Sequence, residues 1–262
     1  MAFAVKVTNL YEVALPVATQ TSDERTEAIQ RGFEQMLVKV SGDPAVGERP
    51  VIKSAINKAD YYVEAFNYAA SARPASEDEK LKWQDGLAAS HYFIHIRFEK
   101  EDVNRLLKKA EVNYWGEHRP LLMVWLAIKE KDKEPQIIGN ETANDLLTNF
   151  EQEGKKYGLP LIFPAMDISD MNLVSVDDVT KPSLDVLKEA SRRYAPDMFL
   201  IGNVQANKDG YEGQWELVLG DTQWRWSIKD KTAALVVSRA LGRASQTLTK
   251  RYAINNSVTQ QA

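Results

Sequence analysis

The chain has 262 residues, 44% of them hydrophobic and 27% charged, a composition typical of a soluble globular protein with one large or two ordinary domains. Its formal net charge of -4 argues against nucleic acid as a partner, because phosphate binding needs a basic surface. No cysteine is present, which excludes disulfides, thiolate zinc sites and cysteine nucleophiles. No run approaches the roughly 20 apolar residues of a membrane helix, so we expect no transmembrane segment.

The first residues favour export. Ala2-Phe3-Ala4 is a small-x-small pattern like the end of a secretory signal peptide, although no charged or apolar region precedes it. We interpret this stretch as the remnant of a trimmed signal peptide. The alternative is an ordinary disordered start.

The first half alternates between strand and helix periods. Asp23–Val40 has apolar residues at helical spacing, which predicts an amphipathic helix. His91–Lys100 alternates as a half-buried strand does. Weaker patterns predict strands at Val5–Val17 and Tyr61–Tyr68, helices at Arg49–Lys58 and Val103–Ala110, and a polar loop at Ser71–Asp85.

The longest apolar run of the chain lies within Tyr114–Ile128. Leu121–Ile128 is continuously apolar and too short for a buried helix, which predicts a strand buried on both faces. Pro120 suits the first residue of such a strand, where no ladder donor is needed. We predict that this strand is the centre of the first half's sheet.

A charged run at Lys129–Pro135 is the best candidate boundary between two halves, although a hairpin tip is also possible. We predict an N-terminal α/β domain over residues 5–130, a C-terminal α/β domain over residues 136–254 and a disordered tail over residues 255–262. The second half has an irregular acidic segment at Asp167–Val179, then an antiparallel meander and a long final helix at Lys231–Tyr252. The expected fold class is α+β, with two layered halves that each have a sheet covered by helices.

Signatures of catalysis are missing from the sequence. We find no phosphate-binding glycine loop, dinucleotide fingerprint, nucleophile elbow or zinc-protease motif. His91 and His95 lie four apart on a predicted strand, roughly 13 Å between their Cα atoms, and cannot chelate one metal ion. The stretches Asp167–Asp178 and Gln205–Glu216 lack the features of a calcium loop. We therefore predict neither a metal site nor a cofactor.

Two groups of residues remain as candidates for function. Glu117-His118-Arg119 is the one charged cluster beside a predicted buried strand. Arg119 either bonds turn carbonyls or a buried carboxylate, or it belongs to an unfamiliar reactive site. Trp215, Trp224 and Trp226 alternate along the meander, either as core residues beneath a helix or as a stacking surface for a ligand.

A set of short motifs runs through nearly the whole chain. Its most specific part is Trp115-Gly116, Arg119-Pro120 and Trp125-Leu126, and earlier parts are Leu10-Tyr11-Glu12, Pro16-Val17 and Leu37–Gly42. Together they resemble a proteobacterial family known as domain of unknown function 2066 (DUF2066). The resemblance implies an exported protein with a signal peptide, and it assigns no activity. The candidate functional or fingerprint residues are thus Trp115, Gly116, His118, Arg119 and Trp125.

The second half is similar in layout to the amino-terminal domain of TolB and related envelope modules. The points of similarity are Leu161–Pro164, a helix, Phe199–Gly202, a meander and a closing helix. The similarity concerns the fold alone, and a fold does not fix a function. It favours a binding module in the periplasm.

The sequence thus favours a non-enzymatic, periplasmic envelope protein that binds another protein or a cell-wall component. The alternative is a hydrolase or other enzyme with an unrecognised site near His118 and Arg119. A weaker alternative is a small-ligand receptor that uses the three tryptophans of the meander.

Overall fold

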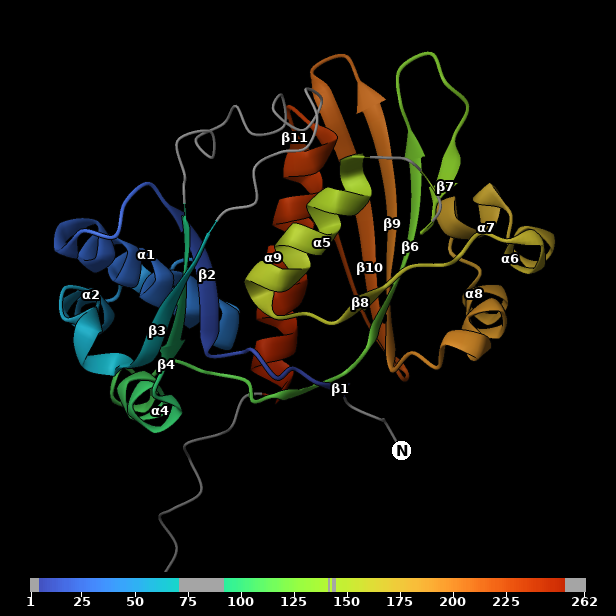
Figure 1. Ribbon diagram of the computed structural model, residues 1–262. Helices are drawn as coiled ribbons and strands as arrows, with labels where there is room; N and C mark the ends of the chain where they lie inside the picture. Colours follow the sequence, from blue (N-terminus) through green and yellow to red (C-terminus); the bar gives the residue numbers. More distant parts are fainter. Residues whose placement is uncertain (1–4, 71–91, 141, 143–144, 253–262) are drawn as a thin grey trace, which may run out of the picture. The chain divides into compact units, whose positions relative to one another are not determined.

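The computed structural model describes residues 5–70, 92–140, 142 and 145–252, and its fold is α+β (Figure 1). The chain forms two compact units, each of which is described by itself. The N-terminal unit comprises Thr8–Trp115 and the chain from Tyr252, and the C-terminal unit comprises Gly116–Arg251 and the chain up to Val7.

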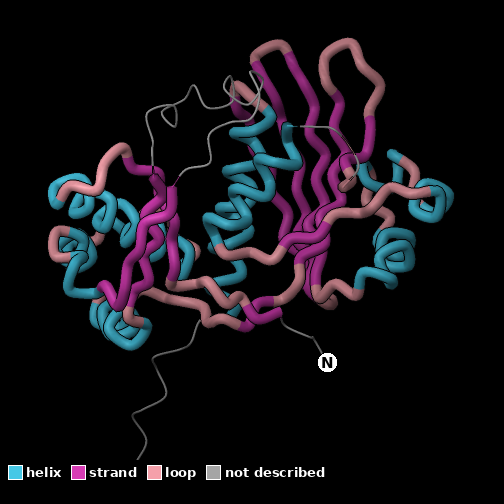
Figure 2. The backbone as a smooth tube through the Cα atoms, viewed as in Figure 1, coloured by secondary structure: helices cyan, strands magenta, loops and turns pink. Residues whose placement is uncertain are grey.

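A three-stranded antiparallel sheet with helices on one face forms the N-terminal unit (Figure 2). The strand order is β2-β4-β3, and α1 packs on β2 and β4 while α2 packs against both α1 and α4. The elements are β2 (Glu12–Val17), α1 (Ser22–Ser41), α2 (Pro50–Ile56), β3 (Val63–Ala70), β4 (Tyr92–Phe98) and α4 (Lys100–Lys109), with 3-10 turns at Val46–Glu48 and Ala59–Tyr62.

The predicted first helix is confirmed by α1. Its apolar stripe, which includes Phe33 and Met36, is fully buried. The helix ends at Gly42, which has a φ of 66° and donates its N–H to the carbonyl of Val38 at 2.7 Å. This left-handed position favours glycine because a Cβ would be strained there.

The sheet of the N-terminal unit is covered on one face only. Ile94 and Ile96 of β4 are buried, whereas His95 and Arg97 between them are exposed. Arg97 forms an ion pair with Glu12 of the neighbouring strand at 2.8 Å. The alternation follows from the strand period of two.

A larger mixed sheet organises the C-terminal unit. Its strand order is β11-β10-β9-β6-β7, and β8 pairs with β6 in parallel. Strand β6 also runs parallel to β9 and antiparallel to β7. The elements are β1 (Val5–Lys6), β5 (His118–Arg119), β6 (Leu122–Lys129), β7 (Gln136–Ile138), α5 (Asp145–Tyr157), β8 (Leu161–Ile162), α6 (Ile168–Leu173), α7 (Val176–Thr180), α8 (Leu184–Ser191), β9 (Met198–Asn207), β10 (Gly210–Leu219), β11 (Thr222–Asp230) and α9 (Ala233–Tyr252), with a 3-10 turn at Arg192–Tyr194.

Helices cover both faces of this sheet (Figure 1). On one face, Trp125 of β6 and Ile201 of β9 share a core with Leu187 of α8 and Val179 of α7. On the other face, Trp215 of β10 lies against Phe150 of α5, with ring centroids 6.2 Å apart. Gly202 makes room for this indole, because a Cβ there would lie 2.4 Å from the Trp215 ring.

The structure corrects the predicted placement of the long apolar strand. Leu122–Lys129 is a central strand, and Leu122–Ile128 is buried as predicted, but it lies in the sheet of the C-terminal unit rather than in that of the first half. The physical reason is that both its faces are apolar, and only a sheet with helices on both sides buries both. The predicted domain boundary near residues 130–136 moves accordingly to Gly116.

Two other predictions for the second half also change. Lys129–Pro135 connects the antiparallel strands β6 and β7, so it is the hairpin tip rather than a domain boundary. The acidic segment predicted to be irregular contains two short helices, α6 and α7. The meander of β9, β10 and β11 and the final helix α9 are confirmed. The predictions for Met1–Ala4, Ser71–Asp85, His91 and residues 255–262 lie outside the described residues.

Candidate functional site

Arg119 is a buried structural cation. Its side chain is among the largest fully buried ones, with 1% of the residue exposed. Nη1 donates to the carbonyls of Tyr157 at 2.6 Å and Gly158 at 3.0 Å, and Nε donates to the carbonyl of Gly116 at 3.2 Å. The guanidinium therefore ties the end of α5 to the strand before β6, which is the local role predicted for it.

The two residues before Arg119 lie against Lys6 of β1. His118 is exposed and pairs with Lys6 in the short ladder of β5 and β1. The Glu117 carboxylate lies 3.8 Å from the Lys6 ammonium. With the guanidinium directed at backbone carbonyls, the hydrolase alternative near His118 and Arg119 gains no support from this geometry.

Trp115, Gly116 and Trp125 also hold structural positions. Trp115 is 3% exposed, and its backbone N–H donates to the carbonyl of Val40 at 3.1 Å. The Gly116 carbonyl accepts from Arg119, as described above. Trp125 is fully buried in the core between β6 and α8, where its indole N–H donates to Ser191 Oγ at 2.9 Å. The proposed fingerprint thus coincides with packing and backbone pairing.

The tryptophans of the meander do not form a ligand platform. Trp215 and Trp226 face each other on β10 and β11 and are 2% and 8% exposed, and only Trp224 is partly exposed. Val236 of α9 lies beside Trp215, in the space left by the missing side chain of Gly213. The Arg243 guanidinium of α9 lies 6.0 Å from the Trp226 ring. The Trp215 and Trp226 rings lie against the last helix, which corrects their interpretation as a binding surface, whereas Trp224 is partly exposed.

Asp167 at the start of α6 and Asp170 within it belong to a hydrogen-bonded network rather than a calcium site. Asp167 caps α6 by accepting from the N–H of Asp170, and it accepts two bonds from Arg193 at 2.8 and 3.0 Å. Asp170 is 1% exposed and accepts from the Met166 N–H and the Tyr194 hydroxyl. No group of three or more potential metal ligands was found in the parts of the chain that the structure describes.

The Asp167–Arg193 pair predicts a specific acid sensitivity. Hydrogen bonds from Arg193 and from backbone N–H groups lower the pKa of Asp167 to about 2. A depressed carboxyl pKa stabilises the fold above the ordinary value near 3.8, and this contribution is lost as the pH falls from there towards 2. In urea titrations, the wild-type chain should lose more stability across this pH window than Asp167→Asn, which keeps a capping side chain without the charge. Parallel curves for the two chains would contradict this role.

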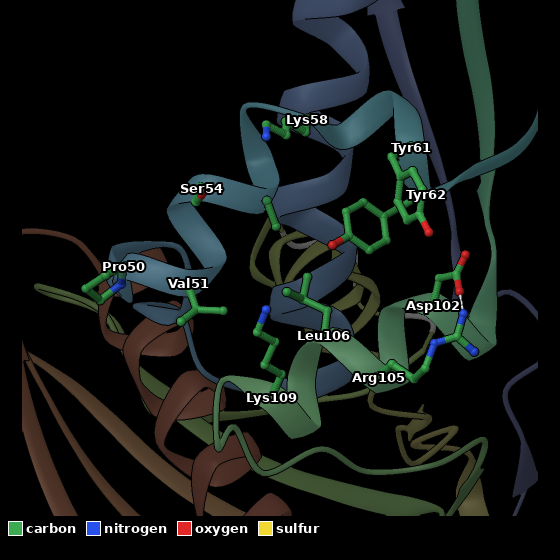
Figure 3. Close-up of a pocket in the computed structure, with 11 residues that line it drawn as sticks. Pro50, Val51, Ser54, Lys58, Tyr61, Tyr62, Asp102, Arg105, Leu106 and Lys109 are labelled. Carbon is green, nitrogen blue, oxygen red and sulfur yellow. Dashed lines mark ion pairs between the residues drawn. The ribbon is translucent and has the colours of Figure 1, made fainter.

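An open groove in the N-terminal unit is a candidate binding site. It lies between α2 and the following turn on one side and α4 on the other, with a volume of about 650 Å³ (Figure 3). Buried Ala55 and Leu106 contribute apolar floor, and Tyr62 stacks on Phe33 beneath it with ring centroids 4.7 Å apart. Burial raises the pKa of Tyr62 above its ordinary value.

The rim of this groove is apolar in part and cationic in part. Val51 and Tyr61 are 39% and 72% exposed at the rim. Lys58 lies beyond α2 and Lys109 on α4, and neither forms an ion pair with another described residue. Arg105 is paired with Asp102 on the same helix. Large exposed apolar groups beside unpaired cations are typical of a binding surface for an anionic, partly apolar ligand.

Comparisons with known proteins point to the same unit. Residues 4–116 match the family described as a domain of unknown function, DUF8605. No curated protein and no solved structure matches the chain. The matched range contains the N-terminal sheet and its groove, and ends where the C-terminal unit begins.

Sequence reasoning found both helices of the groove but missed the groove. Its lining comes from Pro50–Tyr62 and Asp102–Lys109, two stretches about 40 residues apart that the fold brings together. The available signal was the Tyr61-Tyr62 pair next to lysines at the end of a short helix.

None of the helices in the described ranges combines the length and the apolar character that a membrane crossing needs.

Proposed function

We propose that this chain is an exported, periplasmic binding module without enzymatic activity, and that the groove between α2 and α4 receives its envelope partner. The observation that carries the proposal is the groove itself, an apolar floor under an exposed aromatic and two lysines that form no ion pair with a described residue. Its location supports the proposal as well, because the groove lies in the unit matched by DUF8605. Export rests on Ala2-Phe3-Ala4 and on the resemblance to DUF2066 and, in layout, to the TolB amino-terminal domain.

The partner classes differ in what they would need from the groove. A glycan of the cell wall is typically held by aromatic faces and many hydrogen-bonding groups, whereas a protein segment needs apolar anchors and a polar rim. Ala55, Leu106 and Val51 offer aliphatic surface, and Lys58 and Lys109 offer charge. These residues favour a protein partner over a cell-wall component.

The test is photo-crosslinking in intact cells of the source organism. A photoreactive phenylalanine analogue at position 61 should capture one envelope protein, because Tyr61 is 72% exposed at the rim of the groove. Fractionation of the same cells should place the chain in the periplasm. Capture of no protein other than the chain itself, or a cytoplasmic location, would overturn the proposal.

A charge-reversed variant makes the test specific to the groove. Lys58→Glu with Lys109→Glu should reduce the crosslinked yield about tenfold or more, since each reversal replaces attraction by repulsion at the rim. The matched control is Lys53→Glu with Lys108→Glu, which changes the net charge equally at exposed positions of α2 and α4 that do not line the groove. Equal yields from the two variants would show that the partner binds elsewhere.

A further inference from the structure

The C-terminal unit presents an apolar surface on the acidic segment (Asp167–Val179). Ile168, Met171 and Leu173 of α6 are 75%, 58% and 52% exposed, which makes them three of the large exposed hydrophobic residues of the molecule. Ile168 and Met171 are three residues apart, so they are neighbours on one side of the helix. Exposed clusters of this kind mark interaction surfaces.

This apolar surface is held in a fixed conformation. A six-residue helix is too short to be stable by itself. Here it is fixed by Asp167 at its start and by the buried Asp170, whose carboxylate lies 2.8 Å from Arg193 Nη2 and accepts from Tyr194. Presenting Ile168 and Met171 on an already ordered helix lowers the entropy lost on binding.

The segment that carries this helix is acidic in sequence. The acidic segment contains four aspartates and no lysine, arginine or histidine. Arg193 offsets part of this charge through Asp167 and Asp170. Asp177 at the start of α7 is exposed and forms no ion pair with any described residue. A complementary surface would therefore combine an apolar floor with unpaired cations.

The groove of the N-terminal unit has this complementary chemistry. It has an apolar floor, an exposed Tyr61, and Lys58 and Lys109, which no described residue pairs with. The lengths also agree, because α6 spans about 9 Å and α2 about 10 Å at 1.5 Å per residue. The two surfaces are opposite in charge and alike in apolar character, which are the conditions for a specific protein contact.

We propose that the acidic segment of one copy of this chain docks into the groove of a second copy. The contact joins two different surfaces, so a pair of copies keeps one free groove and one free segment, and association continues head to tail into chains or closed rings. The inference rests on the groove assigned above and goes beyond the envelope partner: a groove that holds a neighbour's segment is closed to that partner, so self-association and partner binding compete. It does not require export.

The test is the mass of the full-length protein in sedimentation velocity over a concentration series. The wild-type chain should gain mass as its concentration rises. The groove variant Lys58→Glu/Lys109→Glu and the segment variant Ile168→Ser/Met171→Ser should each stay monomeric, with association weakened tenfold or more. The controls Lys53→Glu/Lys108→Glu and Leu235→Ser, which change exposed residues elsewhere, should associate like the wild type.

Mixing the two monomeric variants decides the geometry of the contact. The groove variant retains an intact segment and the segment variant retains an intact groove, so an equal mixture should form dimers and nothing larger. A mixture that stays monomeric, or a wild-type chain that stays monomeric at all concentrations, overturns the proposal. Because this readout uses purified protein alone, its failure leaves the envelope partner of the crosslinking experiment untouched, and the reverse also holds.

Discussion

Replacing Arg119 by alanine is expected to lower the free energy of unfolding by about 3–5 kcal/mol, the usual loss when one partner of a buried charged interaction is removed. Three carbonyls, those of Gly116, Tyr157 and Gly158, would lose a charge-assisted donor at a site that water does not reach. The corresponding fall in Tm is about 10 °C, at about 2–4 °C per kcal/mol for a chain of this size. Urea and thermal unfolding followed by tryptophan fluorescence would measure both.

Two further variants show whether geometry or charge matters at this position. Arg119→Lys keeps the charge but cannot span three carbonyls with a planar fork, so it should lose an intermediate amount of stability. Arg97→Ala removes an exposed arginine from a surface ion pair and should cost less than about 1 kcal/mol. A stable Arg119→Ala chain that fails to bind its partner would instead give Arg119 a functional role.

Local patterns predicted most of the elements, because the spacing of apolar residues and the residues that end helices and strands are local properties of the sequence. The spacing of Phe33 and Met36, with Gly42 after them, contains all that α1 requires. The alternation of Ile94 and Ile96 with His95 and Arg97 likewise contains what β4 requires. Local patterns did not predict helix α6 in the acidic segment, because α6 depends on Arg193, some 25 residues away in the chain.

The partition of the chain into two units was not readable from the sequence. The apolar run of β6 shows that both its faces are buried, but not by which elements. Its neighbour β9 lies about 75 residues further along the chain, while the strand nearest before it in sequence belongs to another sheet. The charged run Lys129–Pro135, chosen as the domain boundary, assigned this strand to the first half and so to the wrong sheet.

The candidate site was hidden for a related reason. The groove consists of ordinary surface residues on two predicted helices, and only the packing of α2 beside α4 places Lys58 and Lys109 around one floor. Residues that looked distinctive in the sequence, such as Arg119 and Trp215, are distinctive because they are buried. Rare residue types beside apolar runs identified the core more readily than the binding surface.

Replacing Trp125 by alanine is expected to destabilise the C-terminal unit by about 3–5 kcal/mol, the usual cost of removing a large aromatic side chain from a core. Trp125 has no exposed surface, and its ring contributes to the core shared by β6, β9, α7 and α8. Urea unfolding is the direct measurement. Trp224→Ala provides the matched control, because Trp224 is partly exposed on the edge strand β11 and should cost clearly less.

The variant Trp125→Phe separates packing from any functional role of this fingerprint residue. Phenylalanine keeps much of the apolar volume and removes the indole N–H, so the expected loss is about 1–2 kcal/mol. Ser191 Oγ remains bonded to the carbonyl of Leu187 at 2.6 Å, which limits the damage. Crosslinking at position 61 should be unchanged in this variant, because Trp125 lies in the C-terminal unit and the groove in the N-terminal unit. A chain that keeps its stability but loses the crosslink would place Trp125 in the binding machinery instead.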